Sequence, residues 1–144
     1  MNAVSSKTFK SGNSVAVRLP KALGIAPARG AARVTTILKT ETVSVYVVFA
    51  CEEDARRIGR EMVERRLAAC VNILGGCHSI YRWQGEIEEA DEMAAIFKTS
   101  WESAEPLAAA IAERHGYDVP AIAIWPIVAA TRDYQAWVLK NSGG

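Results

Sequence analysis

Hydrophobic positions change their spacing along the chain, and each change predicts an element. Residues 43–49 are β-branched and aromatic and become continuously apolar toward their end, which is typical of a central strand. Residues 52–70 repeat apolar side chains at three- and four-residue intervals, with arginine and glutamate mostly on the other face. This spacing predicts an amphipathic helix with Cys70 at the end of its apolar stripe. Three acids at 52–54 suit its start, because the helix dipole favours anions there.

The second half of the chain predicts three more strands, a helix and a closing turn. Thr99 is the expected helix cap, with Glu102 reaching back to it, although Pro106 favours a start nearer Ser103. In order, the predicted elements are a strand over 71–83 broken by two glycines, a turn at 84–86, a strand over 87–99, a helix ending at 115–116, a strand over 121–128 and a helical turn over 134–139. The order β-α-β-β-α-β predicts an α+β fold of the ferredoxin-like type.

The first 40 residues follow a different pattern. A turn over 11–14 separates two short segments, 8–10 and 15–19, which together predict a small hairpin. The proline- and glycine-containing stretch 26–32 then predicts a linker. We therefore divide the chain into an N-terminal extension, residues 1–40, and a ferredoxin-fold domain, residues 41–144.

Charge separates the same two regions. The formal net charge is only +1, yet residues 1–40 carry seven lysines or arginines and no acid. A basic extension attached to an acidic domain points to binding of nucleic acid or of an acidic surface. A leader that only aids solubility explains the charge equally well. The side chains predicted to contact phosphates are Lys7, Lys10, Arg18 and Lys21.

Composition narrows the class of protein and its compartment. Half of the 144 residues are apolar and 23% are charged, which fits a folded domain and excludes wholesale disorder. No apolar window is long enough to span a membrane, and the N-terminus lacks the apolar core of a secretory signal. Three irregularly spaced cysteines do not make a disulfide framework, so we expect free thiols and a cytoplasmic location.

Five ordered segments of the domain carry a family resemblance: RLAACVNI (66–73), SIYRWQG (79–85), FKT (97–99), HGYDVP (115–120) and YQAW (134–137). With them, residues 43–139 resemble the CutA divalent-cation tolerance family. The resemblance implies a ferredoxin-like homotrimer, architecturally similar to the PII signalling proteins, whose long second and third strands pair between subunits. Gly116 and Ala121 depart from the family pattern, which usually has a proline and a glutamate there. That glutamate lines a polar cleft between subunits in similar proteins.

The extension carries a resemblance of its own. Residues 9–21, FKSGNSVAVRLPK, are similar to the opening of AbrB/MazE/VapB-type antitoxins, which are swapped-hairpin DNA-binding domains. Such a domain needs a second hairpin, and the residues available for it run into the first strand of the next domain. Half of such a barrel cannot bury its own apolar face. We interpret the extension as a truncated or remodelled module, or as the junction of a fusion, which only pairing with another chain could complete.

The candidate metal ligands are Cys70, Cys77, His78 and His115. Thiolate and imidazole suit copper and zinc, and Cu(II) leads the divalent affinity order. No Cys-x-x-Cys or His-x-x-x-His pair is present, which argues against a preformed tetrahedral zinc site. Cys70 also fits a small buried hydrophobe, and His115 fits a group that interacts with a helix C-terminus. In the family that the motifs resemble, the histidine at the position of His115 and cysteines are linked to copper, but Cys77 matches no family position.

A second candidate site follows from the resemblance. The positions that border the inter-subunit cleft in the family are Lys98, Tyr81, Trp83, Tyr117 and Tyr134. Lys98 would be the counter-charge of an anion or small ligand, or one half of an ion pair between subunits. The aromatic residues also fit trimer packing. The acidic run over 86–92 fits either a hard-cation site or a solvated strand face.

No catalytic constellation is present in the sequence. It has no phosphate loop, no supported Ser-His-Asp order and only two histidines, so we expect no enzyme activity and no organic cofactor. The first hypothesis is a cytoplasmic homotrimer in divalent metal tolerance, copper above all, that binds Cu(II) or another divalent cation or acts as a signalling scaffold. The alternative is a DNA-associated fusion whose extension binds nucleic acid. A structural trimer that binds partners is the third reading.

Overall fold

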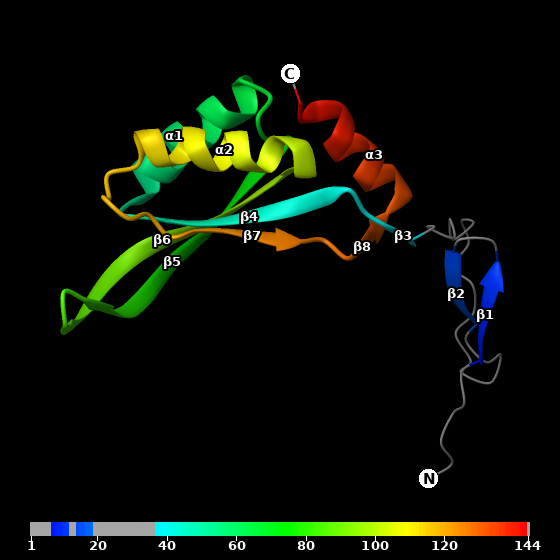
Figure 1. Ribbon diagram of the computed structural model, residues 1–144, viewed down its shortest axis with the longest axis horizontal. Helices are drawn as coiled ribbons and strands as arrows, with labels where there is room; N and C mark the ends of the chain where they lie inside the picture. Colours follow the sequence, from blue (N-terminus) through cyan, green and yellow to red (C-terminus); the bar gives the residue numbers. More distant parts are fainter. Residues whose placement is uncertain (1–6, 12–13, 19–36, 144) are drawn as a thin grey trace, which may run out of the picture.

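The computed structural model describes residues 7–11, 14–18 and 37–143, with side chains for residues 40–143 (Figure 1). In chain order the elements are β1 (Lys7–Ser11), β2 (Ser14–Arg18), β3 (Ile37–Lys39), β4 (Thr42–Phe49), α1 (Glu52–Glu64), β5 (Cys70–Trp83), β6 (Glu86–Ser100), α2 (Trp101–Arg114), β7 (Ile122–Pro126), β8 (Ala129–Thr131) and α3 (Arg132–Asn141).

The main sheet has four antiparallel strands in the order β5-β6-β4-β7. Figure 1 shows α1 and α2 side by side over one face of this sheet. Two βαβ units interlocked in this order make the ferredoxin-like fold, so the predicted fold class is confirmed. The other face of the sheet, which we call the open face, has no helix across it in the described part of the chain.

The core lies between the sheet and the two helices. Along β4, Val43, Val45 and Val47 are fully buried, and alternate residues point to the open face. Ile58 of α1 and Leu107 of α2 are also fully buried against this apolar row. The sequence pattern of β4 and α1 therefore folds as expected, because one face of each element has an apolar layer to pack against.

Two predicted helix boundaries are wrong. Helix α1 ends at Glu64, and Arg66 then adopts a φ of 58°, which stops the helix and starts the turn into β5. Cys70 therefore opens a strand and does not close the helix stripe. Helix α2 begins at Trp101, capped by Ser100, whose hydroxyl accepts a hydrogen bond from the Ser103 N–H at 3.2 Å. Thr99, the expected cap, is buried in β6 and donates to the Leu67 carbonyl at 2.7 Å.

Strands β5 and β6 continue far beyond the rest of the sheet (Figure 1). The two glycines expected to break β5 do not interrupt it. The register instead shifts between Ile73 and Gly75, which leaves Leu74 without a partner in β6 as a β-bulge. Beyond it, residues 76–92 form a two-stranded ribbon, which we call the arm. The arm closes in the expected tight turn, where Gln84 and Gly85 have φ values of 49° and 91°.

Three smaller features lie near the C-terminus and in the N-terminal extension. Strand β8 pairs with β3, so residues 37–39 are hydrogen-bonded to the domain although they fall within 1–40. Helix α3 is longer than the helical turn expected at 134–139. The hairpin predicted in the extension is present, with Ser11 opposite Ser14 and Lys7 opposite Arg18. The division of the chain into an extension and a domain remains a prediction.

Candidate functional site

A groove runs between the arm and the loop that follows α2. Its volume is about 730 Å³, and both the arm strands and residues 116–121 line it. Tyr81 and Trp83 enter it from β5, and Tyr117 enters it from the loop. Three of the five residues predicted to border a cleft therefore line one groove of a single chain. Gly116 and Ala121, the two positions that depart from the family pattern, line it as well.

Carboxylates contribute the polar chemistry of this groove. Glu92 faces it from β6 and accepts a hydrogen bond from the Tyr117 hydroxyl at 2.9 Å. Burial, together with this carboxylate, raises the pKa of Tyr117 to about 12. Burial and the charges of Glu88 and Glu92 also raise the pKa of Tyr81. For both tyrosines burial is the larger cause, and the neighbouring carboxylates add to it.

Lys98 and Tyr134, the other two predicted cleft residues, lie outside the groove. Lys98 donates a hydrogen bond to the Asn72 side chain and pairs across the strands with Cys70. The Cys70 sulfur lies 4.0 Å from the hydroxyl of Tyr134, which comes from α3. Burial, then Cys70, raises the pKa of Tyr134 to about 12. The five predicted cleft residues therefore form two separate clusters within one chain.

The four predicted metal ligands are also dispersed. Cys70 opens β5, Cys77 and His78 lie on the arm, and His115 follows α2. Cys77 and His78 point to opposite faces of the ribbon, as successive strand residues do. Across residues 40–143, no three His, Cys, Asp or Glu side chains are arranged to hold one metal ion. The set remains a prediction, and one chain does not assemble it.

His78 has carboxylates on both sides of its ring. Its Nδ1 lies 2.8 Å from Asp91, directly across the strands, and its Nε2 lies 2.9 Å from Glu89. The hydrogen bonds to Asp91 and then Glu89 raise the pKa of His78. The side chain is 53% exposed, so solvent and ions reach the cluster. The acidic run of the arm therefore includes the partners of a predicted metal ligand.

His115 has both ring nitrogens engaged inside the protein. Its Nε2 lies 2.9 Å from the Val48 carbonyl, and its Nδ1 accepts a hydrogen bond from the Tyr117 N–H at 3.2 Å. The two bonds together fix the neutral tautomer with the proton on Nε2, because a carbonyl only accepts and an N–H only donates. The ring also stacks on Phe49, with centroids 5.1 Å apart. His115 joins β4 to the groove loop and has no free lone pair for a metal.

Sequence reasoning missed residues that complete these clusters. Glu88 and Glu92 were seen only as part of an acidic run, and Asn72 was not a candidate. Glu88 and Glu92 have a detectable signal, because alternate positions of a strand share a face with Tyr81 and Trp83 once the turn fixes the register. The contact between Glu92 and Tyr117 has no such signal, since it joins residues 25 apart from different elements.

The candidate nucleic-acid residues lie in the extension. Lys7, Lys10 and Arg18 belong to the β1–β2 hairpin, and Lys21 lies outside the described residues. Nucleic-acid binding through this hairpin remains a prediction.

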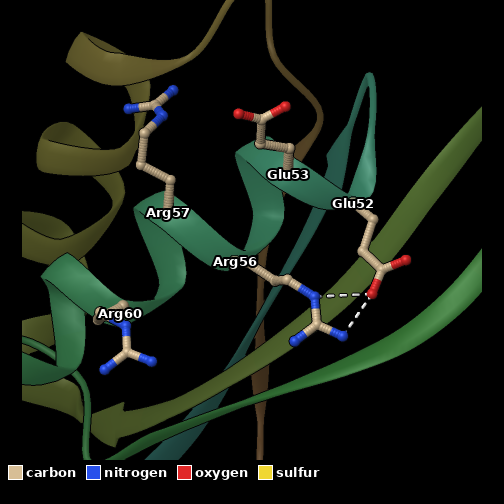
Figure 2. Close-up of a pocket in the computed structure, with 5 residues that line it drawn as sticks. All are labelled: Glu52, Glu53, Arg56, Arg57 and Arg60. Atoms are coloured by element: carbon tan, nitrogen blue, oxygen red, sulfur yellow. Dashed lines mark hydrogen bonds and ion pairs between the residues drawn. The ribbon is translucent and has the colours of Figure 1, made fainter.

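An arginine-rich surface on α1 is a further concentration of charge. Figure 2 shows Glu52, Glu53, Arg56, Arg57 and Arg60 along the outer side of the helix. Arg56 Nε donates to Glu52 at 2.7 Å, and Arg57 pairs with Asp54 at 2.7 Å, so two of the three guanidinium groups have a carboxylate partner within the helix. These are exposed pairs one helical turn apart, which typically stabilise a helix by only about 0.3–0.5 kcal/mol each. Nothing in this surface converges on a ligand.

No helix in the described part of the chain is both long and apolar enough to cross a membrane.

Comparisons with known proteins agree with this fold. The sequence profile described as "CutA1 divalent ion tolerance protein" matches residues 43–141. The "Divalent-cation tolerance protein CutA" of Thermus thermophilus is 42% identical over 99 residues, which are 69% of this chain and 96% of the relative. "Protein CutA, chloroplastic" of Arabidopsis thaliana is 37% identical over 70% of this chain and 55% of its own length. A solved structure of the Thermus thermophilus protein covers 71% of this chain and 99% of that one, with 41% identity and a TM-score of 0.69.

Proposed function

Because the chain belongs to the CutA1 divalent ion tolerance family, we propose that it acts in tolerance of divalent metal ions, as a homotrimer and without catalysing a reaction. The observation that carries the proposal is the match of the family profile to residues 43–141, which span the whole ferredoxin-like fold. The antitoxin-like extension lies outside this match, so the proposal rests on the domain alone.

The apolar surface of the chain supports assembly. Trp125 is 46% exposed on the open face, where it stacks on Tyr46 with ring centroids 4.9 Å apart. On the arm, Ile80 and Ile87 are 65% and 58% exposed. The outer edge of β5 has no strand partner among the described residues, although it is 14 residues long. A long unpaired edge beside apolar side chains favours pairing with another chain.

For the metal, we propose that Cu(II) or another divalent cation contacts the arm at His78. The imidazole is exposed, and two carboxylates lie within hydrogen-bond distance of it. Imidazole with carboxylate oxygen is a donor set that Cu(II) accepts. A metal would replace the proton on one ring nitrogen, and Asp91 would then hold the ring or join as a second ligand. His115 is not part of this proposal, because both of its nitrogens are engaged.

Calorimetric titration of the reduced protein with Cu(II) tests the metal proposal. We expect saturable binding that His78→Ala removes and His115→Ala retains. Cys77→Ser is the matched control on the arm, since its side chain lies on the opposite face. Binding that survives His78→Ala would place the metal elsewhere.

A growth experiment tests the tolerance role itself. A bacterial strain lacking its own family member should regain growth in raised Cu(II) when it carries the wild-type chain. If it does not regain growth, the tolerance role is wrong.

We also propose a cytoplasmic location. All three cysteines are unpaired, and unpaired thiols persist in a reducing compartment. Fractionation of cells that express the protein from its own promoter would test this location. Recovery of the protein from the periplasm or from an organelle would contradict it.

A further inference from the structure

We propose that β3 acts as a strap that couples the N-terminal extension to α3. While β3 is paired with β8, the first turn of α3 is held in place and Tyr134 stays beside Cys70. When β3 is drawn away from β8, the strand β8 and the first turn of α3 are released together. This coupling goes beyond the divalent-ion role, because it gives residues ahead of the family match an influence on the domain.

Strand β8 depends on β3 for its pairing. Among the described residues β3 is its one strand partner, and Ile37 lies opposite Thr131. The family profile begins at residue 43, so this partner comes from ahead of the matched region. Figure 1 shows the two strands side by side near the start of α3. Removing β3 would leave the paired backbone groups of β8 without their partners.

The N-terminal end of α3 is fastened through β8. Thr131 ends the strand and Arg132 begins the helix, with no residue between them. The Thr131 hydroxyl makes no capping hydrogen bond within the described structure, so the backbone pairing of β8 fixes the conformation from which the helix starts. Tyr134 follows within the first turn, where its hydroxyl lies 4.0 Å from the Cys70 sulfur.

The other end of α3 is held by different contacts. The Gly143 N–H donates to the Arg66 carbonyl at 2.8 Å, and the Arg66 guanidinium donates to the Lys140 carbonyl at 2.6 Å. Among the described residues of α3, only Val138 is buried, and a helix of ten residues is marginal on its own. Loss of β3 would therefore release the first turn of α3 while the last turn stays attached.

The strap is short enough to open without the rest of the sheet. Strand β3 has three residues, whereas β4 pairs with β6 along all eight of its residues. One side-chain contact adds to the strap, because the Thr40 hydroxyl donates a hydrogen bond to the Ile127 carbonyl ahead of β8. Short segments with few buried contacts open at a lower free energy than core strands do. Paired and released β3 are thus the two states through which the extension acts on α3.

Amide hydrogen exchange of the full-length protein, resolved by NMR, tests the coupling. Leu38→Pro should disrupt β3, because proline removes a backbone donor and restricts the chain. The amides to follow are those of residues 136–138, which bond back to the first turn of α3. We expect their exchange to become about tenfold faster or more, which corresponds to about 1.4 kcal/mol. Val17→Pro is the matched control, because it places the same substitution in β2, which pairs with β1, and it should leave these amides unchanged.

A second variant uses the fact that coupling between two sites is reciprocal. Val138→Ala, which loosens α3, should also make the exchange of residues 37–39 faster. The proposal is wrong if Val138→Ala leaves residues 37–39 unchanged, or if Leu38→Pro affects residues 129–131 alone, because β3 would then be only a local edge strand. Equally faster exchange of residues 43–49 in Leu38→Pro would mean that the whole domain is destabilised, which would also overturn it.

Discussion

Strands β5 and β6 pass through two regions that differ sharply in burial. In the body of the sheet, Ala95 and Phe97 are fully buried under the helices, next to β4. In the arm, Ile87 of the same strand is 58% exposed, and Ile80 across from Glu89 is 65% exposed. The backbone pairing is continuous through both regions apart from one bulge.

This difference shows that alternating apolar and polar residues along a strand do not by themselves create a core. In the body, a second layer of helices covers one face of the strands, and apolar burial stabilises the pair. Among the described residues, neither a third strand nor a helix packs on the arm, and an isolated two-stranded ribbon is marginal in water. Within one chain it is supported by polar contacts such as those of His78, and the homotrimer that we propose would add contacts between copies.

The largest expected effect is a substitution in the body. Phe97→Ala should lower the free energy of unfolding by about 3–5 kcal/mol, because it removes a fully buried aromatic ring and leaves a cavity. Ile87→Ala, ten residues earlier on β6, should cost clearly less because its side chain is mostly exposed within the chain. Urea unfolding of both variants measures the difference. Equal losses would remove the distinction between body and arm.

A smaller effect is expected where the body meets the groove loop. His115→Ala should destabilise the fold by about 1–3 kcal/mol, because the Val48 carbonyl and the Tyr117 N–H each lose a partner. His115→Gln should recover part of that loss, since an amide can both donate and accept. Thermal unfolding measures both variants. No loss of stability in His115→Ala would contradict a structural role for this residue.

The bulge between body and arm gives a third test. Gly75 has a φ of 121°, which side-chain-bearing residues rarely adopt, and a Cβ there would meet nothing within 4 Å. Gly75→Ala should therefore cost about 1–3 kcal/mol through backbone strain alone. Gly76→Ala is the neighbouring control, where a Cβ would meet only the Glu92 carbonyl oxygen at 3.9 Å. Denaturant unfolding compares the two, and equal stabilities would show that the bulge tolerates a side chain.

The smallest expected effect is the pH dependence of the arm. Asp91 and Glu89 raise the pKa of His78 above its ordinary 6.5, so the charged form is favoured in the folded state. The stabilisation is therefore fully present below pH 6.5 and is lost as the pH rises through the raised pKa. Unfolding midpoints at about pH 5.5 and about pH 8.5 should differ more for the wild type than for His78→Gln. Identical pH dependence in the two proteins would contradict this role.

Much of the fold could be predicted from the sequence, because β4, α1 and the arm turn combine strong periodicity with clear turn residues. The choice between Thr99 and Ser100 as the helix cap could not, since both are hydroxyl residues and a tertiary contact with Leu67 decides it. Of the five predicted cleft residues, Tyr81, Trp83 and Tyr117 line one groove of a single chain, whereas Lys98 and Tyr134 lie apart from it. The cleft between subunits remains a prediction, because contacts between copies cannot be read from the sequence of one chain.

The mass of the protein in solution tests most directly our central proposal, that other copies of the chain cover the open face and the arm. Sedimentation of the wild type should give three times the chain mass of 15.6 kDa. Trp125→Glu, which places a charge on the open face, should shift the protein toward a single chain while its secondary structure is retained. A wild-type protein that sediments as a single chain at all concentrations would contradict the account.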